Sequence, residues 1–438
     1  MKKPLLSRLC ALAFMFCACA TAFAGFGENN LAPIAAPRLF VAKGATDAKG
    51  TFSCVNYGTN PVTSYRYTAT VNGQVVEEKE VKLTEPINVN DFGKLLVKVP
   101  TFNQLGDHQL VCNITHVNGK PNTTTFSSST LDITVVTKVP TCRVVFEDYT
   151  AMWCRYCPRA TAIMEYLTKK HPDDFIGIAV HQGDKIAIAD YKRPQVDRFG
   201  LPYVWASRRA KVSGYTGEDL YQEAKARGAV MDIDVKAEWN ASGNAINVQS
   251  TTTFRTNMSN ANYALAYVIV EDGMHNASWC QLNAFNGETE LLGENEELGV
   301  FIKGSGEVYG LKYNHVARAF LGIDSGMEGS LPKNVVADRG IKHQAMFEGV
   351  GRNWTPQNKK NLRVVVMVLD NSTNSIVNGA HCPIKPYNTT GVATTKNTDQ
   401  RVEVARFNLK GQRLSAPERG INIVKYSDGT VEKVRVRQ

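Results

Sequence analysis

The sequence lacks long hydrophobic runs and the motifs of several common enzyme classes. After residue 24 no stretch approaches 18 uninterrupted apolar residues, so we expect no transmembrane helix. The chain has no glycine-rich phosphate loop, no His-Glu-x-x-His helix and no Gly-x-Ser-x-Gly elbow. It also has no stripe of basic and aromatic residues, although its net charge is +9 over 438 residues. We therefore expect no cofactor and no nucleic-acid partner.

Cysteine is scarce, and its spacing is informative. Of the ten cysteines, only Cys154 and Cys157 have the C-x-x-C spacing. No second C-x-x-C and no His-x-x-x-His pair accompany them, which argues against a zinc site. We expect no metal. Beyond the first 24 residues the other cysteines are Cys54, Cys112, Cys142, Cys280 and Cys382.

The segment 148–158 predicts a β-strand that ends in a Trp-Cys-x-x-Cys turn and opens a helix. Two thiols at i and i+3 of a helix start can close a small disulfide, and the helix dipole favours a thiolate on the first sulfur. Pro158 suits the first turn, where its missing N–H loses no partner. Apolar residues then recur at helical spacing along one face: Ala160, Ile163, Met164 and Leu167.

This pattern resembles the thioredoxin superfamily. An acidic residue, Asp148, stands six positions before the first cysteine, Trp153 directly precedes that cysteine, and Leu201-Pro202 fits the cis-proline position. The resemblance implies that Cys154 attacks a substrate disulfide and that Cys157 resolves the product. It further implies that Asp148 assists proton transfer, Pro202 holds the substrate backbone and Trp153 shields the site. The alternative is a structural disulfide on a scaffold that no longer turns over.

The thioredoxin-like α/β domain is expected over residues 139–228. Its strands are expected at 143–149, 175–181 and 203–206, with a last helix running to Arg227. Thioredoxins have a two-stranded hairpin after the cis-proline, and here only residues 209–212 could supply the second strand. This is a departure from the superfamily pattern.

Two β-sandwich domains are expected to flank this α/β domain. Residues 30–138 alternate in polarity between turn signals, and the separation of Cys54 and Cys112 resembles the bridge of an immunoglobulin-like sandwich, with Tyr67 near the core aromatic position. Residues 229–385 are again strand-rich, and a Cys280–Cys382 bridge is plausible. Cys142 is left over, either as a buried core thiol or as a third thiol near the site.

The two ends of the chain indicate export. Residues 1–24 have a charged start, an apolar run and an Ala22-Phe23-Ala24 cleavage pattern, as in a secretory signal peptide. Lipid attachment at Cys17 or Cys19 is the alternative. A polar linker, 386–398, precedes an alternating segment, 399–438, that predicts a small antiparallel β-unit. This tail resembles the C-terminal secretion domain of Bacteroidetes surface proteins; the alternative is a hairpin packed on the body.

Residues 139–385 resemble the twenty-eight-kilodalton outer-membrane protein family of Bacteroidetes. The resemblance rests on the segments 147–158, 270–273 and 314–318. It implies an exported protein of the outer membrane, the cell surface or the periplasm. His315 and Arg318 match the family pattern Asn-His-Val-x-Arg, but such residues on a strand are more often a packed pair than a site. His181, after the central strand, is interpreted as structural.

Two functions are compatible with these patterns. The first is a thiol-disulfide oxidoreductase of the cell envelope that acts on protein thiols and disulfides. The second is a surface adhesin or binding protein with a host or cell-surface ligand, in which the thioredoxin-like domain is only structural.

Overall fold

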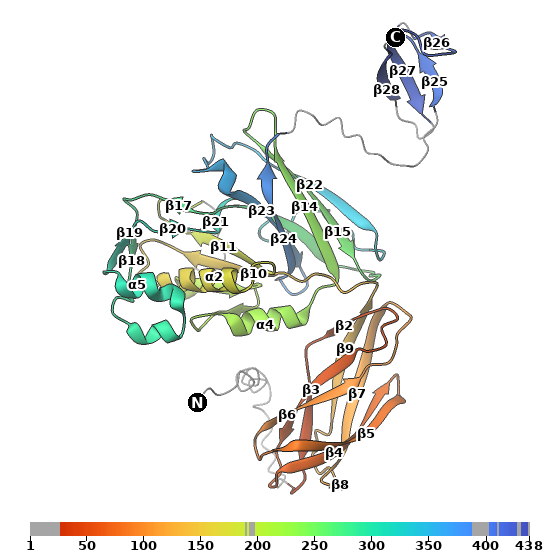
Figure 1. Ribbon diagram of the computed structural model, residues 1–438, viewed down its shortest axis with the longest axis vertical. Helices are drawn as coiled ribbons and strands as arrows, with labels where there is room; N and C mark the ends of the chain where they lie inside the picture. Colours follow the sequence, from red (N-terminus) through yellow and green to blue (C-terminus); the bar gives the residue numbers. More distant parts are fainter. Residues whose placement is uncertain are drawn as a thin grey trace. The chain divides into compact units, whose positions relative to one another are not determined.

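The computed structural model describes residues 27–188, 191, 198–387, 403–409, 411–426 and 431–436. Strands dominate these residues, which agrees with the expected β-rich, multi-sheet architecture (Figure 1). No helix among them is both long and apolar enough to cross a membrane. The predicted signal peptide and most of the predicted linker 386–398 lie outside the described residues.

The N-terminal region is a sandwich of two sheets that share one core. The smaller sheet has the order β1 (Leu31–Ala35), β3 (Lys49–Asn56), β6 (Phe92–Lys98). The larger has the order β2 (Leu39–Ala42), β9 (Ser128–Val136), β7 (Gly106–Val117), β4 (Val62–Val71), β5 (Gln74–Ile87), with β8 (Lys120–Pro121) beside β7. Apolar residues of both sheets meet in a single cluster that includes Tyr67, which is fully buried as expected.

The predicted Cys54–Cys112 disulfide is not formed, and both residues are free thiols. Cys54 lies on β3 and Cys112 on β7, so the two face the same core from opposite sheets. Burial raises the pKa of each thiol to about 12, and both are neutral at physiological pH. They therefore act as small apolar core residues.

A single eleven-stranded sheet forms the central part of the molecule. Its order is β13 (Ala210–Lys211), β12 (Tyr203–Ala206), β10 (Val144–Thr150), β11 (Phe175–His181), β21 (Val316–Leu321), β16 (Tyr263–Glu271), β23 (Leu362–Asp370), β24 (Ser375–Lys385), β14 (Met231–Trp239), β15 (Ile246–Phe254) and β22 (Gly340–Phe347). The short β13 pairs with β12 and supplies the second hairpin strand expected at 209–212.

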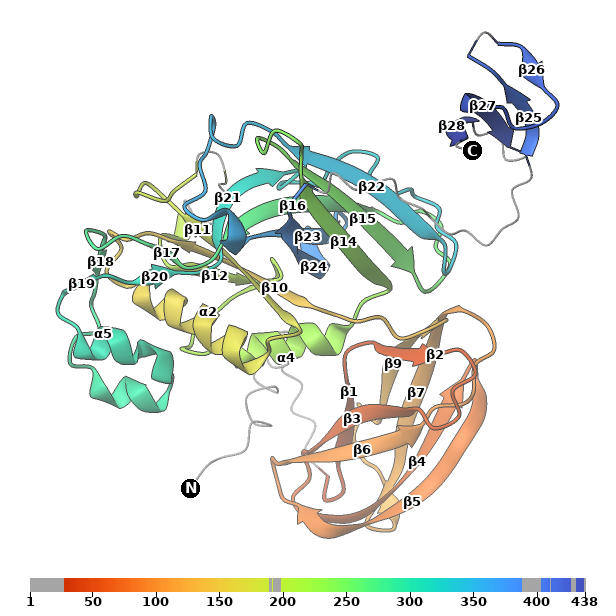
Figure 2. The ribbon, with the colours of Figure 1, turned by 45° about the horizontal axis from the view of Figure 1, so that its top comes forward.

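Helices α2 (Pro158–Lys170) and α4 (Glu218–Arg227) lie along one side of β10, β11 and β12 (Figures 1 and 2). The four apolar residues predicted to share one face of α2 are all buried. They pack against alternate residues of β10, Val144 and Phe146. This packing sets α2, and with it the Trp-Cys-x-x-Cys turn, on one defined side of the sheet.

The sheet crosses the predicted domain boundary at residue 228. Strand β11 of the α/β region pairs in parallel with β21 through Ala179 and Val316, so the strands of 139–228 and 229–385 belong to one hydrogen-bonded sheet. Farther along, β15 lies over β16 without pairing with it, and the Ser250 hydroxyl hydrogen-bonds the Tyr267 hydroxyl at 2.8 Å. The sheet therefore folds over its own core, and the division at 228 is not a break in the sheet.

Short elements between β16 and β21 add a second layer beside the α/β region. They are β17 (Met274–His275), β18 (Cys280–Leu282), η2 (Thr289–Gly293), η3 (Glu296–Leu298), α5 (Gly299–Lys303), β19 (Glu307–Tyr309) and β20 (Lys312–Tyr313), and η4 (Lys359–Asn361) precedes β23. Strand β18 pairs with β19, and β17 pairs with β20.

The predicted Cys280–Cys382 disulfide is wrong, because both thiols are free. Cys280 lies on β18, next to Tyr309 in the small sheet. Cys382 lies on β24, opposite Val364 of the large sheet, and packs against its core. The two sulfurs thus have different neighbours. Cys142 is also a free, buried thiol, in agreement with its interpretation as a core residue.

The C-terminal segment forms a compact unit of its own, residues 388–438, apart from residues 1–387. Its described residues make an antiparallel sheet of the order β26 (Arg413–Leu414), β25 (Glu403–Phe407), β27 (Gly420–Tyr426), β28 (Val431–Val436). This confirms the predicted antiparallel β-unit. Its role in secretion stays a prediction.

Removal of residues 388–438 should leave the stability of the remaining chain unchanged, because those residues form a separate compact unit. We expect the melting temperature of the truncated protein to stay within about 2 °C of the full-length value. Differential scanning calorimetry of the two proteins measures it.

The same truncation tests the secretion role in the native host. The truncated protein should be found in the periplasm rather than at the cell surface. Surface exposure of the truncated protein would exclude a sorting role, and a loss of several degrees would identify the tail as a packed structural element.

Candidate functional site

Cys154 and Cys157 form a disulfide at the start of α2, with their Cα atoms 5.4 Å apart. The turn is closed by backbone hydrogen bonds from the Cys154 N–H to the Ala151 oxygen and from the Cys157 N–H to the Cys154 oxygen. Pro158 takes the first helical position, as expected, and the last turn carries Lys169 and Lys170.

The two sulfurs differ in access. Cys157 is fully buried, whereas Cys154 keeps 6% of its surface exposed. Leu201 packs against both cysteines and Ala151. Of the two cysteines, Cys154 is thus the more exposed. Their roles as attacking and resolving thiols stay a prediction.

Asp148 is buried beneath the helix that carries the disulfide. It is 1% exposed and points to the same side of β10 as Phe146, because alternate strand residues share a face. Its Oδ1 has no hydrogen-bond partner within the described residues. Burial raises the pKa of Asp148 to about 8, opposed only in part by the Arg159 guanidinium of the first helical turn. At neutral pH this carboxyl group mostly holds a proton.

Pro202 stands beside the disulfide loop because β12 follows it directly. Strand β12 runs antiparallel to β10, with Tyr203 opposite Tyr149 and Val204 opposite Asp148. The Leu201–Pro202 peptide bond is cis. The chain thus brings Leu201-Pro202 beside the segment 148–157, which carries Asp148, Cys154 and Cys157.

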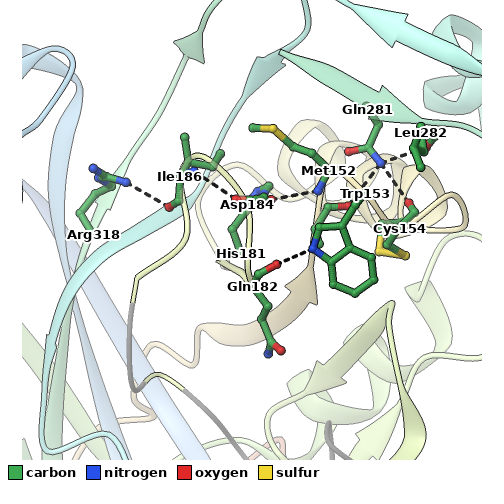
Figure 3. Close-up of polar contacts among 12 residues, drawn as sticks. Met152, Trp153, Cys154, His181, Gln182, Asp184, Ile186, Gln281, Leu282 and Arg318 are labelled. Atoms are coloured by element: carbon green, nitrogen blue, oxygen red, sulfur yellow. Dashed lines mark hydrogen bonds and ion pairs between the residues drawn. A yellow bond between two sulfur atoms is a disulfide. The ribbon is translucent and has the colours of Figure 1, made fainter.

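Trp153 lies at the surface next to Cys154, and its role as a shield of the disulfide stays a prediction. Its side chain is 53% exposed, and its Nε1–H donates to the Gln182 oxygen at 2.9 Å (Figure 3). The loop after β11 therefore holds the indole ring. Tyr156, between the cysteines, is 57% exposed. Two aromatic rings beside Cys154 are thus open to a partner.

Asp184, which no sequence motif singled out, supports the turn from the same loop. Its carboxylate accepts hydrogen bonds from the Met152 N–H at 2.9 Å, from the Ile186 N–H at 3.0 Å and from His181 Nδ1 at 2.7 Å (Figure 3). Burial acts to raise the pKa of Asp184, but these partners outweigh burial and lower it. His181 is therefore a structural residue, as interpreted from the sequence.

A third support comes from β18, about 130 residues away in sequence. The Leu282 N–H donates to the Met152 oxygen, and the Ala284 N–H donates to the Arg155 oxygen, each at 2.8 Å. Gln281 reaches the same turn with its side chain (Figure 3). Nothing in the local sequence of residues 280–284 predicts this contact.

Glu147, next to Asp148, points to the opposite face of the sheet and is neutralised there. Its carboxylate forms a two-pronged ion pair with Arg208, at 2.6 Å and 2.7 Å, and accepts a hydrogen bond from the Tyr191 hydroxyl at 2.8 Å. Both charged side chains are fully buried. This cluster was not predicted, although Glu147-Asp148 is visible as an acidic pair in an apolar strand.

His315 and Arg318 do not contact each other as a pair. His315 Nδ1 accepts from Arg363 at 2.6 Å, and its Nε2 lies 3.0 Å from the Thr168 hydroxyl. Burial, assisted by the Arg363 charge, lowers the pKa of His315 to about 4. Arg318 instead donates to the Ile186 and Thr355 oxygens. Each residue joins structural elements, and no group of three or more metal-binding side chains occurs in the described chain.

Known proteins offer only distant comparisons. No protein-family model and no curated protein matches this chain. Among solved structures, HBP35 of Porphyromonas gingivalis is 17% identical and covers 67% of this chain and 98% of its own, with a TM-score of 0.40. A domain of the outer membrane lipoprotein Omp28 from the same organism is 12% identical, covers 36% and 92%, and has a TM-score of 0.22. A CARDB domain from Pyrococcus furiosus is 17% identical, covers 26% and 100%, and also has a TM-score of 0.22. With TM-scores this low, these likenesses support no conclusion about family or activity.

Replacement of Asp148 by Asn should stabilise the oxidised protein increasingly as the pH rises. The buried carboxyl group holds its proton more tightly in the folded state, with a pKa of about 8, than in the unfolded state, near 3.8. The wild type therefore loses up to about 1.4 kcal/mol of unfolding free energy per pH unit across that window, relative to Asp148→Asn. Urea unfolding at pH values from 4 to 9 measures the difference.

Asp148→Ala provides the control for side-chain packing. Its unfolding free energy, relative to wild type, should change with pH as that of Asp148→Asn does. It should be lower by a constant amount because the smaller side chain leaves unfilled volume. A difference between wild type and Asp148→Asn that stays constant from pH 4 to pH 8 would contradict a raised pKa for Asp148.

Proposed function

We propose that the protein is an exported thiol-disulfide oxidoreductase with a thioredoxin-like site. The observation that carries the proposal is a disulfide at a helix start, with one sulfur accessible, above a buried carboxyl group of raised pKa. The proposal is supported by Asp148, Trp153, Cys154, Cys157 and Pro202, the residues on which the sequence resemblance to the thioredoxin superfamily rests. Perturbed carboxyl groups next to nucleophiles are typical of catalytic sites.

The reaction begins from the oxidised state seen in the structure. A substrate thiolate attacks Sγ of Cys154, the Cys154–Cys157 bond breaks, and Cys157 leaves as a thiolate that takes up a proton. A second substrate thiolate attacks the substrate sulfur of this mixed disulfide and releases Cys154. The substrate dithiol has then lost two electrons and two protons to the cysteine pair. Exchange with an external disulfide restores the oxidised site, and the same steps in reverse reduce a substrate disulfide.

Asp148 supplies or accepts the proton at Cys157. A carboxyl group with a pKa of about 8 holds a proton at neutral pH and can deliver it to the departing thiolate. Cys157 is fully buried, so water has no direct access to it. Asp148, on the face of β10 that α2 covers, would therefore act as the proton donor for the buried Cys157 sulfur.

The surroundings of Cys154 favour a protein substrate over a small thiol. Trp153, Tyr156 and Phe199 are each more than half exposed, although such large aromatic side chains are usually covered. An extended peptide could pack on these rings while its cysteine meets Cys154. Pro202 would hold the backbone of that peptide, as the resemblance implies.

The site of action is proposed from the sequence. A signal peptide over residues 1–24 and a sorting tail over residues 399–438 would bring the protein to the outer membrane, the cell surface or the periplasm. Membership of the twenty-eight-kilodalton outer-membrane protein family of Bacteroidetes would fit the same location. An oxidising compartment would also maintain the Cys154–Cys157 disulfide.

Replacement of Cys157 by Ser should trap substrates. Without the resolving thiol, Cys154 keeps its partner as a mixed disulfide, which non-reducing electrophoresis and mass spectrometry of the native host identify. Cys154→Ser should trap nothing. Cys280→Ser in the Cys157→Ser background is the matched control, since Cys280 is a free and partly exposed thiol, and its loss should leave trapping unchanged.

The adhesin remains the second candidate, because β-sheet elements occupy most of the described chain. A Cys154→Ser/Cys157→Ser variant distinguishes the two functions. Full retention of surface binding and of the cellular phenotype, together with no trapped partner for Cys157→Ser, would support the adhesin and reject the enzyme.

The reduction potential of the Cys154–Cys157 pair should lie above that of thioredoxin, about −270 mV. Arg155 adds an exposed positive charge between the cysteines, which stabilises the thiolate and thus the reduced form. Equilibration with glutathione buffers measures the potential. A value at or below that of thioredoxin would contradict an oxidant or isomerase role.

A further inference from the structure

We infer that Gln281 is a positioning residue for the nucleophilic cysteine. This inference rests on the proposed function and adds a residue from outside the thioredoxin-like region. Gln281 lies on β18, which belongs to the second layer and not to the α/β unit that carries the disulfide. Its side chain is only 2% exposed and points at the Trp-Cys-x-x-Cys turn (Figure 3).

The contacts of the Gln281 amide fix its orientation. Nε2 lies 3.0 Å from the Cys154 oxygen, 3.4 Å from the Ala151 oxygen and 3.0 Å from the Leu282 oxygen. All three partners are carbonyl oxygens, which only accept hydrogen bonds. The NH₂ end of the amide must therefore face the turn. An apolar side chain could fill the same buried space, so the amide of Gln281 has a role beyond packing: it hydrogen-bonds the backbone of Cys154.

The Cys154 carbonyl oxygen occupies a central place in the turn. It accepts the Cys157 N–H that closes the turn, at 3.2 Å, and it also accepts the Gln281 amide. The Ala151 oxygen is likewise shared between the Cys154 N–H and Gln281. Gln281 thus bonds the peptide unit that follows Cys154 directly, and it supports the unit before Cys154 through the Ala151 oxygen that accepts the Cys154 N–H. Both contacts hold the Cys154 backbone at the helix start.

This position decides how well the helix stabilises a Cys154 thiolate. The helix dipole and free N–H groups act over the first turn only, so a small displacement of the sulfur weakens their effect. A carboxyl group in place of the Gln281 amide would remove both N–H donors, and once ionised it would add a buried negative charge beside the thiolate. Loss of the amide should therefore raise the pKa of Cys154 and shift the redox equilibrium toward the disulfide.

The test compares three variants of the full-length protein. Gln281→Leu removes the amide at similar volume, and Gln281→Glu replaces it with an acid. Asn283→Leu is the matched control, because Asn283 is also 2% exposed and follows β18, but its amide donates to the Phe301 and Ser305 oxygens, away from the disulfide. Each reduced protein is alkylated with iodoacetamide across pH values, and modification of Cys154 is followed by peptide mass spectrometry.

We expect Gln281→Glu to raise the midpoint of the Cys154 alkylation profile by about one pH unit or more. Gln281→Leu should raise it by less, and Asn283→Leu should leave it at the wild-type value. The equilibrium constant with glutathione should move in parallel, by about tenfold for one unit, toward the oxidised protein. Melting temperatures separate these effects from stability, since both Leu variants lose buried hydrogen bonds.

Equal midpoints for Gln281→Leu, Asn283→Leu and wild type would overturn the inference and leave Gln281 as a purely structural residue. The outcome is independent of the proposed function, because the midpoint is a property of Cys154 that needs no substrate. Absence of any trapped partner with Cys157→Ser would instead reject the oxidoreductase, whatever the midpoints show.

Discussion

Strand β10 carries two adjacent buried carboxyl groups, and the site depends on the different environments of the two. Side chains alternate along a strand, so Glu147 and Asp148 enter opposite faces of the sheet. Glu147 meets a guanidinium and a phenol and is neutralised as a bidentate ion pair. Asp148 meets an apolar layer under α2, where burial raises its pKa to about 8. The same strand thus carries an ion-paired carboxylate on one face and a carboxyl group of raised pKa on the other.

The register of β10 decides which face of the sheet Glu147 and Asp148 each occupy. A shift of β10 by one residue would exchange the two faces and place Asp148 against Arg208, while Glu147 would lie under the helix. The fully buried Glu147–Arg208 pair makes that shift costly, because the Glu147 carboxylate would then be buried under the helix without a cation, and the shorter Asp148 side chain would have to replace it at Arg208. The ion pair therefore stabilises the register of β10 in which Asp148 lies on the same side of the sheet as the disulfide.

Local patterns in the sequence predicted the parts of the site that are close in the chain. The helix from Pro158, the strand through Asp148 and the antiparallel tail all follow from periodicity and turn residues over short windows. Long-range features were missed or wrong. The Cys54–Cys112 and Cys280–Cys382 bridges were inferred from separation and number, but pairing depends on where each strand lies in space. No sequence pattern pointed to Gln281, because its partner Cys154 is 127 residues away in the chain.

The supports of the turn explain why residue 228 is a poor place to divide this chain. The Asp184 carboxylate accepts a hydrogen bond from the Met152 N–H, and the Leu282 N–H donates to the Met152 oxygen. The backbone of Met152 is therefore fixed by one residue from each side of position 228. The parallel pairing of β11 with β21 adds a second connection across that point. A fragment that ended at 228 would keep both cysteines but lose the contacts of Gln281, Leu282 and Ala284. The disulfide turn therefore depends on contacts from both sides of residue 228, and residues 139–228 supply its two cysteines and Asp148 but not all of its supports.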